Sequence, residues 1–368
     1  MTSTNIDDPR GPGRARIPPS RGRSSRGLVR AARRVASFVF SLAVTLFGLL
    51  LVTFLIARVV PLDPVLAVVG DRATQAQYDA ARVELGLDRP IPEQFVRYVG
   101  DVLTGDLGTA NLTGQPVLKD IGRTFPNTLE LATFATILGI VLGIPGGVVG
   151  AVYQGRWPDQ VIRVVGLLGY SMPVFWLGLV ALLIFYGILG WAPGPGRLDV
   201  TQQFTYEFDV TRYTGSVILD SALSGAWDVF RNAVAHLILP AAVLGYFSMA
   251  YISRMTRSFM LEQLGQEYIT AARVKGVPEW RVIWVHALGN AMVPLITVIV
   301  LSYAALLEGS VLTETVFAWP GLGLYVTQAL FAADFNAVLG GTLVIGAMFI
   351  VLNLLSDILY TIVDPRAR

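Results

Sequence analysis

The sequence predicts an all-α integral membrane protein with six transmembrane helices. Of its 368 residues, 54% are hydrophobic and only 15% are charged, which is too apolar for an ordinary soluble domain. Six uncharged stretches are long enough to cross a bilayer, which takes about 20 residues. The predicted spans are residues 35–57, 131–155, 164–196, 232–253, 287–307 and 336–356.

Two of these stretches contain features that interrupt a simple span. The third is longer than one span, and Ser171-Met-Pro173 is expected to kink its helix, because proline removes a backbone hydrogen bond. The fourth is interrupted near its start by His236 and Pro240, so residues 237–255 are the expected span proper. Between the first two spans, residues 75–87 and 94–103 have helical patterning.

The basic residues predict the orientation. Nine arginines lie within residues 1–34, and the connections after the second and fourth spans carry seven further basic residues, whereas residues 308–335 contain no Lys or Arg. Since cytoplasmic loops are enriched in basic residues, both termini are predicted to be cytoplasmic. Binding of the tail to anionic membrane lipid is an alternative role for its arginines.

These features divide the chain into four parts. We assign residues 1–34 to a disordered Arg-rich cytoplasmic tail and residues 35–60 to the first transmembrane helix. Residues 61–127 form an extracytoplasmic loop region, and residues 128–368 form a five-helix core with a charged cytoplasmic segment at 256–287.

The composition excludes several kinds of chemistry. The chain has no cysteine, and its only histidines, His236 and His286, are too far apart in sequence to form a metal site by themselves. Its only lysines, Lys119 and Lys275, are followed by Asp and Gly, so the chain has no phosphate-binding Gly-Lys-Ser/Thr loop. The spans contain no paired carboxylates, and the sequence shows no Ser-His or Cys-His constellation, so nothing in it indicates an enzyme.

The charged cytoplasmic segment is the most informative part of the sequence. Residues 268–275 have good helical propensity, Gly276 supplies a C-terminal stop, and Pro278-Glu279 suits the first turn of a following helix. The segment is therefore predicted to form a helix, a sharp turn and a second helix between two apolar spans.

Several blocks, taken together and in order, resemble the inner-membrane permease subunits of the dipeptide, oligopeptide and nickel class of ABC importers (binding-protein-dependent transport components). The resemblance extends from about residue 35 to residue 366 and implies a type I ABC importer permease fold. The blocks are Leu85-Gly-Leu-Asp-Arg-Pro, Gln94-Phe, Gly105-Asp-Leu-Gly, Pro116-Val, Pro126-Asn-Thr-Leu-Glu-Leu, Ser171-Met-Pro-Val-Phe-Trp, Glu267-Tyr-Ile-Thr-Ala-Ala-Arg-Val-Lys-Gly, His286-Ala-Leu-Gly-Asn-Ala, Glu314-Thr-Val-Phe-Ala-Trp-Pro-Gly-Leu-Gly and Asp364-Pro-Arg.

Two positions depart from the family's cytoplasmic signature. Thr270 stands where the general signature has Glu, and Gly289 stands where the peptide subclass commonly has Arg. The resemblance nonetheless implies that the segment is a coupling helix that docks in a groove of an ATP-binding subunit. The implied docking residues are Glu267, Tyr268, Ile269, Thr270, Ala271, Ala272, Arg273, Lys275 and Gly276.

Of these, Tyr268 and Ile269 are expected to supply apolar contact area, and Arg273 and Lys275 to reach acidic groups of the partner. The alanines would allow a partner to approach the backbone closely. The alternative is a helix that merely lies at the membrane surface.

The translocation path is less clear from the sequence. Candidates are Ser171 and Pro173 at the expected kink and Glu308 near the outer end of the fifth span, since ionisable groups at membrane depth are functional candidates. Glu308 could also simply reach the interface, and Glu314 is expected to lie in the outer loop and to order it. The small-residue repeat of Gly139, Gly143, Gly146, Gly147 and Gly150 favours close helix packing over substrate contact.

The resemblance implies a permease in the bacterial inner membrane that imports di- or oligopeptides. Its implied partners are a sister permease, two ATP-binding subunits that hold ATP and magnesium, and an external solute-binding protein; no nucleic acid and no cofactor in this chain are expected. Alternatives are an importer of nickel chelates or another small solute, and a motor-independent channel.

Overall fold

The computed structural model describes residues 39–55, 64–70 and 72–363. The chain divides into two units, Met1–Gly48 and Leu49–Arg368, and every helix from α2 onward belongs to the second unit. The predicted tail at 1–34, the ends of the predicted first span and the block at Asp364 lie outside the described residues.

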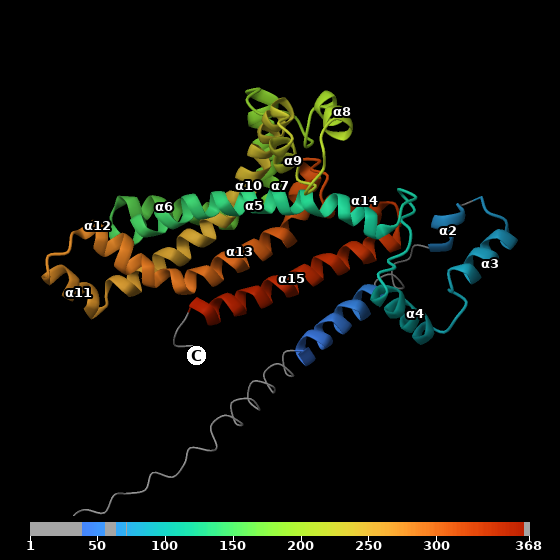
Figure 1. Ribbon diagram of the computed structural model, residues 1–368, viewed down its shortest axis with the longest axis horizontal. Helices are drawn as coiled ribbons and strands as arrows, with labels where there is room; N and C mark the ends of the chain where they lie inside the picture. The colour runs from blue at the N-terminus through green and yellow to red at the C-terminus, as the bar shows by residue number, and fades with distance from the viewer. Residues whose placement is uncertain (1–38, 56–63, 71, 364–368) are drawn as a thin grey trace, which may run out of the picture. The chain divides into compact units, whose positions relative to one another are not determined.

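All regular elements of the described residues are helices, coloured in chain order in Figure 1. The helices at Gln75–Glu84 and Ile91–Leu103 confirm the patterning expected between the first two spans. The bounds are α2 Pro64–Val69, α3 Gln75–Glu84, α4 Ile91–Leu103, α5 Val117–Val152, α6 Trp157–Ser171, α7 Val174–Ala181, η1 Leu182–Ile188, α8 Val200–Phe208, α9 Val217–Leu223, α10 Trp227–Leu264, α11 Glu267–Val274, α12 Glu279–Arg281, η2 Val282–Ala287, α13 Leu288–Val316, α14 Leu322–Phe331 and α15 Phe335–Val363, where η marks a π-helix.

The protein is a multi-pass membrane protein. In the described part of the chain, four helices are long and apolar enough to cross a bilayer: α5, α10, the continuous Glu279–Val316 and Phe335–Ser356 of α15. The bent pair of α6 with α7 and η1 makes a fifth candidate, and Val39–Leu55 is a shorter apolar helix. The count of six spans therefore stays a prediction.

The third predicted span differs most from expectation. It runs from Trp157 to Ile188 as two helices that meet at 102°, far more than a kink. Met172 is extended, as residues before proline tend to be, and Pro173 then starts α7 as its N-cap. The predicted interruption of the fourth span was wrong, because α10 is one continuous helix of 38 residues that contains Pro240.

Close packing of α5 against α10 confirms the expectation drawn from the glycine repeat. A β-carbon built on Gly147 would lie 2.5 Å from Thr256 Cβ and 2.6 Å from the Ser253 carbonyl oxygen, and one on Gly139 would overlap the Ser248 side chain. Hydrogen in place of a side chain is what allows the two backbones to approach this closely.

We expect Gly147→Ala to destabilise the protein by about 1–3 kcal/mol, because the new methyl group would force α5 and α10 apart. Gly309→Ala on α13 is the matched control, since a β-carbon there meets no atom within 4 Å. Thermal unfolding of the purified chain should show a lower melting temperature for Gly147→Ala alone. Equal melting temperatures for the two variants would contradict this account of the packing.

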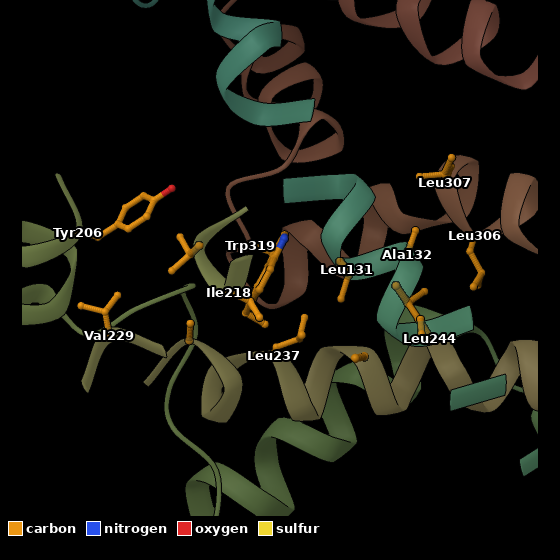
Figure 2. Packing of buried hydrophobic residues seen from close by; sticks show 14 of the residues in the cluster. Leu131, Ala132, Tyr206, Ile218, Val229, Leu237, Leu244, Leu306, Leu307 and Trp319 are labelled. Carbon is orange, nitrogen blue, oxygen red and sulfur yellow. The ribbon is translucent and has the colours of Figure 1, made fainter. Parts of the chain in front are cut away.

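The largest buried cluster among the described residues joins α8, α9 and the connection after α13 to the long helices. Trp319, which is fully buried, lies in one cluster with Leu131 of α5, Ile218 of α9 and Leu237 of α10 (Figure 2). The Trp319 indole Nε1 also donates to the Asn127 carbonyl oxygen at 2.9 Å. The connection between α13 and α14 is thereby held against α5.

Candidate functional site

The predicted helix, turn and helix are present in the charged segment at residues 256–287. The helix α11 follows the end of α10 after two residues, and the pair α11 and α12 is seen in orange in Figure 1. Gly276 has a φ of +76°, the left-handed conformation that lets glycine end a helix. Pro278 is the N-cap of α12, from which the chain continues through η2 into α13.

Ile269 anchors α11 to the rest of the chain. Its side chain is fully buried in a cluster with Met260 of α10, Val282 and Ala287 of η2, and Ala291 of α13. The expectation that Ile269 offers contact area to a partner was therefore wrong. Its apolar side chain is used within the chain, where burying it stabilises the fold by about 1.5–3 kcal/mol.

The opposite face of α11 is uncovered. Tyr268, Thr270 and Ala271 are exposed, whereas Ala272 is half-buried. Val274, which the sequence did not single out, is 83% exposed. A β-carbon on Gly276 would meet no atom within 4 Å, so the end of α11 is open to a partner.

The charges of this segment are arranged differently from expectation. Arg273 makes two hydrogen bonds to Glu279, with Nη2–Oε1 at 2.6 Å and Nε–Oε2 at 3.2 Å. This bonding raises the pKa of the Arg273 guanidinium and ties α11 to α12 across the turn. Lys275 and Glu267 are exposed, and neither forms an ion pair with another described residue. Arg273 thus braces the turn, and Lys275 is the cation available to a partner.

A buried ion pair joins α10 to the first turn of α6. Arg257 binds the Asp159 carboxylate through two guanidinium nitrogens, with Nε–Oδ1 at 2.6 Å and Nη2–Oδ2 at 3.0 Å. Asp159 is almost fully buried and also accepts from the Gly155 amide at 2.9 Å. The sequence did not predict this pair, because its members lie 98 positions apart. The only indication in the sequence was that both charged residues lie next to apolar spans.

Asp159→Asn should lower stability by about 1–3 kcal/mol, because it removes the charge partner of the mostly buried Arg257. Arg163→Gln is the control, since Arg163 is exposed and lies 3.6 Å from Asp159, an arrangement worth at most about 1 kcal/mol. A thermal-shift assay on the purified protein compares the two variants. An unchanged melting temperature for Asp159→Asn would show that the pair contributes nothing.

The three predicted path residues do not form one site in this chain. Ser171 and Pro173 are exposed at the bend between α6 and α7. Glu308 is exposed on α13 and lines a cavity of about 20 Å³ beside Met348 and Phe349 of α15, which neither Ser171 nor Pro173 lines. A cavity of that volume has room for about one water molecule. Their roles in translocation stay predictions.

Glu314 was predicted to lie in the outer loop. It lies instead within α13, where it is fully buried. Its carboxylate accepts hydrogen bonds from Thr128 Oγ1 at 2.7 Å, Ser310 Oγ at 3.1 Å and the Leu324 amide at 3.0 Å. The last of these bonds fixes the start of α14. The expected ordering of the connection between α13 and α14 is thus present, from a position inside α13.

A second buried ion pair joins α5 to the segment that follows η1. Arg197 Nη2 donates to Glu130 Oε2 at 2.8 Å, and the exposed fractions of the two side chains are 7% and 1%. The same guanidinium donates to Asn127 Oδ1 and lies 5.8 Å from the ring of Trp319. No sequence pattern predicted that Arg197 and Glu130 form a pair.

The chain matches two families over most of its length. Residues 139–368 match the family described as binding-protein-dependent transport system inner membrane component, and residues 31–132 match the N-terminal region of such components. The chain therefore belongs to the family of binding-protein-dependent transport system inner membrane components, which are membrane transport subunits rather than enzymes. The type I permease architecture inferred from the sequence blocks agrees with this membership.

The chain is similar to individual members of this family that are named for peptide transport. The chain is 44% identical to the probable D,D-dipeptide transport system permease protein DdpB of Escherichia coli (strain K12), covering 89% of this chain and 95% of the relative. It is 42% identical to the di/tripeptide transport system permease protein DppB of Pseudomonas aeruginosa (strain UCBPP-PA14), covering 88% and 95%. Among solved structures, the inward-facing MetNI methionine ABC transporter aligns at 19% identity with a TM-score of 0.46, covering 65% of this chain and 93% of that chain.

Proposed function

We propose that this chain is a permease subunit of an ATP-driven importer of di- or oligopeptides in the bacterial inner membrane. Its partners in this proposal are a sister permease, two ATP-binding subunits that hold ATP and magnesium, and an external solute-binding protein. The relatives named for dipeptide and di/tripeptide transport support the substrate class.

The observation that carries the docking role is the two-sided character of α11. One face is locked into the chain's own core by Ile269, and the other presents Tyr268, Ala271 and Val274 without cover. A groove in an ATP-binding subunit would bury the second face, while the first transfers any displacement to α10 and α13. Closure of the two ATPases on ATP would then move these helices as a rigid body.

The buried pair of Asp159 and Arg257 extends this connection. Because α10 carries Arg257 two turns before its end, displacement of α11 would reach the start of α6 as well. We therefore expect α5, α6 and α10 to move together on the cytoplasmic side.

The test is uptake of a labelled dipeptide by proteoliposomes that contain the four-subunit complex, with its binding protein on the outside and ATP supplied to the ATPase side. Uptake that requires both ATP and the binding protein is expected. Flux through the purified single chain without ATP would instead support the motor-independent channel. ATP-dependent uptake of a nickel chelate, with none of the dipeptide, would overturn the substrate class.

The proposed orientation places both termini and α11 in the cytoplasm. In this cysteine-free chain, an impermeant thiol reagent should label Ala76→Cys and Ser224→Cys in cells whose outer membrane has been permeabilised, because both positions are exposed on predicted outer segments. Glu262→Cys, exposed near the end of α10, should react only with a membrane-permeant reagent. Labelling of Glu262→Cys by the impermeant reagent would reverse the orientation.

A further inference from the structure

A cavity of about 540 Å³, lined by several charged and polar residues, lies at the end of α5 opposite α11. This volume is within the range of about 300–1,000 Å³ that small-molecule sites occupy. The cavity is a half-open hollow bordered by the start of α5, the segment with α8 that follows η1, and the start of α14. Its lining residues are Thr113, Asp120, Gly122, Arg123, Thr124, Asn127, Arg197, Gln203, Tyr206, Glu207, Arg212, Thr214, Gly215, Pro320 and Tyr325.

Two arginines of the lining are available to an anion. Arg123 is exposed and forms no ion pair or hydrogen bond with another described residue. Arg212 is held over the ring of Tyr206 at 5.1 Å, and its nearest carboxylate oxygen, on Glu207, is 4.0 Å away. Arg197 is different, because Glu130 and Asn127 already occupy its guanidinium. Arg123 and Arg212 are therefore the groups suited to bind a carboxylate.

An acid lies in the same cavity. Asp120 is buried, and its Oδ2 accepts hydrogen bonds from Thr113 Oγ1 and from Tyr325 OH at 3.4 Å. Its Oδ1 receives no hydrogen bond from the described residues, although the residue lines the cavity. Asp120 Oδ1 is also absent from the buried unpartnered atoms of the described residues, so it is accessible. An accessible carboxylate oxygen without a donor is suited to accept from an ammonium group.

The loop wall of the cavity is firmly built. Asp220 accepts hydrogen bonds from the amides of Tyr213, Thr214 and Gly215 and from the Tyr206 hydroxyl. Burial acts to raise the pKa of Asp220, but these hydrogen bonds outweigh it and hold the pKa below its usual value. The carboxylate thus stays ionised and fixes the loop that presents Arg212.

We propose that this cavity is a binding site for a short zwitterionic peptide, with the peptide carboxylate on Arg123 and Arg212 and the peptide ammonium on Asp120. The inference rests on the proposed function for its ligand class. The site lies at the end of α5 that is far from the docking segment, which is α11 with Gly276. With 36 residues, α5 is about 54 Å long. The site would therefore receive peptide on the side where the binding protein releases it.

The test uses the four-subunit complex in nanodiscs without binding protein, titrated with the dipeptide Ala-Ala by ligand-observed NMR. Arg123→Gln, at an exposed position, should raise the dissociation constant about tenfold or more, because it removes a charge-assisted hydrogen bond. The C-terminal amide of Ala-Ala should bind wild type weakly and be insensitive to this substitution. N-acetyl-Ala-Ala should be insensitive to Asp120→Asn but sensitive to Arg123→Gln.

Arg82→Gln on α3 is the matched control, an exposed arginine outside the cavity that should leave every titration unchanged. Absence of Ala-Ala binding to wild type, or equal binding by Arg123→Gln, would overturn the site. A weaker affinity of Arg123→Gln for the binding protein, with unchanged peptide titration, would also overturn it and assign the cavity to docking. Binding by wild type without ATP-driven uptake would leave the site standing and contradict the proposed function, so the two failures are distinguishable.

Discussion

Gly276→Asp is expected to abolish transport while the protein remains in the membrane at normal abundance. Gly276 has a φ of +76°, and a residue with a β-carbon pays about 1–2 kcal/mol to adopt that conformation. Its new carboxylate would also enter the proposed interface with the ATPase, where an unpaired buried charge is costly. Since a loss of 1.4 kcal/mol already weakens binding tenfold, the affinity for the ATPase should fall by more than about tenfold.

The measurement is co-purification of the ATP-binding subunit with the permease, together with ATP-driven peptide uptake. Gly225→Asp is the matched control, because Gly225 has a φ of +72° and, like Gly276, no atom within 4 Å of a built β-carbon. It should carry the same backbone strain without touching the docking segment. Normal uptake by the Gly276→Asp complex would contradict the docking assignment. An equal loss of uptake in both variants would show that the effect of Gly276→Asp comes from backbone strain and not from docking.

Arg197→Met should lower the stability of the protein by about 3–5 kcal/mol. The substitution leaves Glu130 as an uncompensated charge, with its side chain only 1% exposed. It also removes the hydrogen bonds from Arg197 to Asn127 and to the Gly215 carbonyl oxygen, which hold the segment between η1 and α9 against α5. Thermal unfolding of the purified complex should show the loss as a lower melting temperature.

The double variant Arg197→Met with Glu130→Met separates the pair from the packing around it. Replacing both charges with apolar side chains of similar size leaves no buried charge unpaired, so much of the lost stability should return. A double variant as unstable as Arg197→Met alone would show that packing and the bonds to Asn127 and Gly215 dominate. Full stability of Arg197→Met would show that the pair contributes little.

Local features of the fold followed from the sequence because their causes are local. Hydropathy located the long apolar helices, and the helix of the docking segment with its stop at Gly276 was predicted from propensity and the conformational freedom of glycine. The spacing of small residues in α5 likewise predicted a close approach to another helix.

The tertiary structure decided which side chains are used within the chain and which are left for a partner. Helical periodicity does not distinguish a face that packs on its own bundle from one that docks elsewhere, so Ile269 was assigned outward although it is fully buried. Proline predicted a bend at Pro173, but the 102° angle depends on how α6 and α7 pack. Ion pairs between residues 98 and 67 positions apart, such as Asp159 with Arg257 and Glu130 with Arg197, depend on helix contacts that no local pattern encodes.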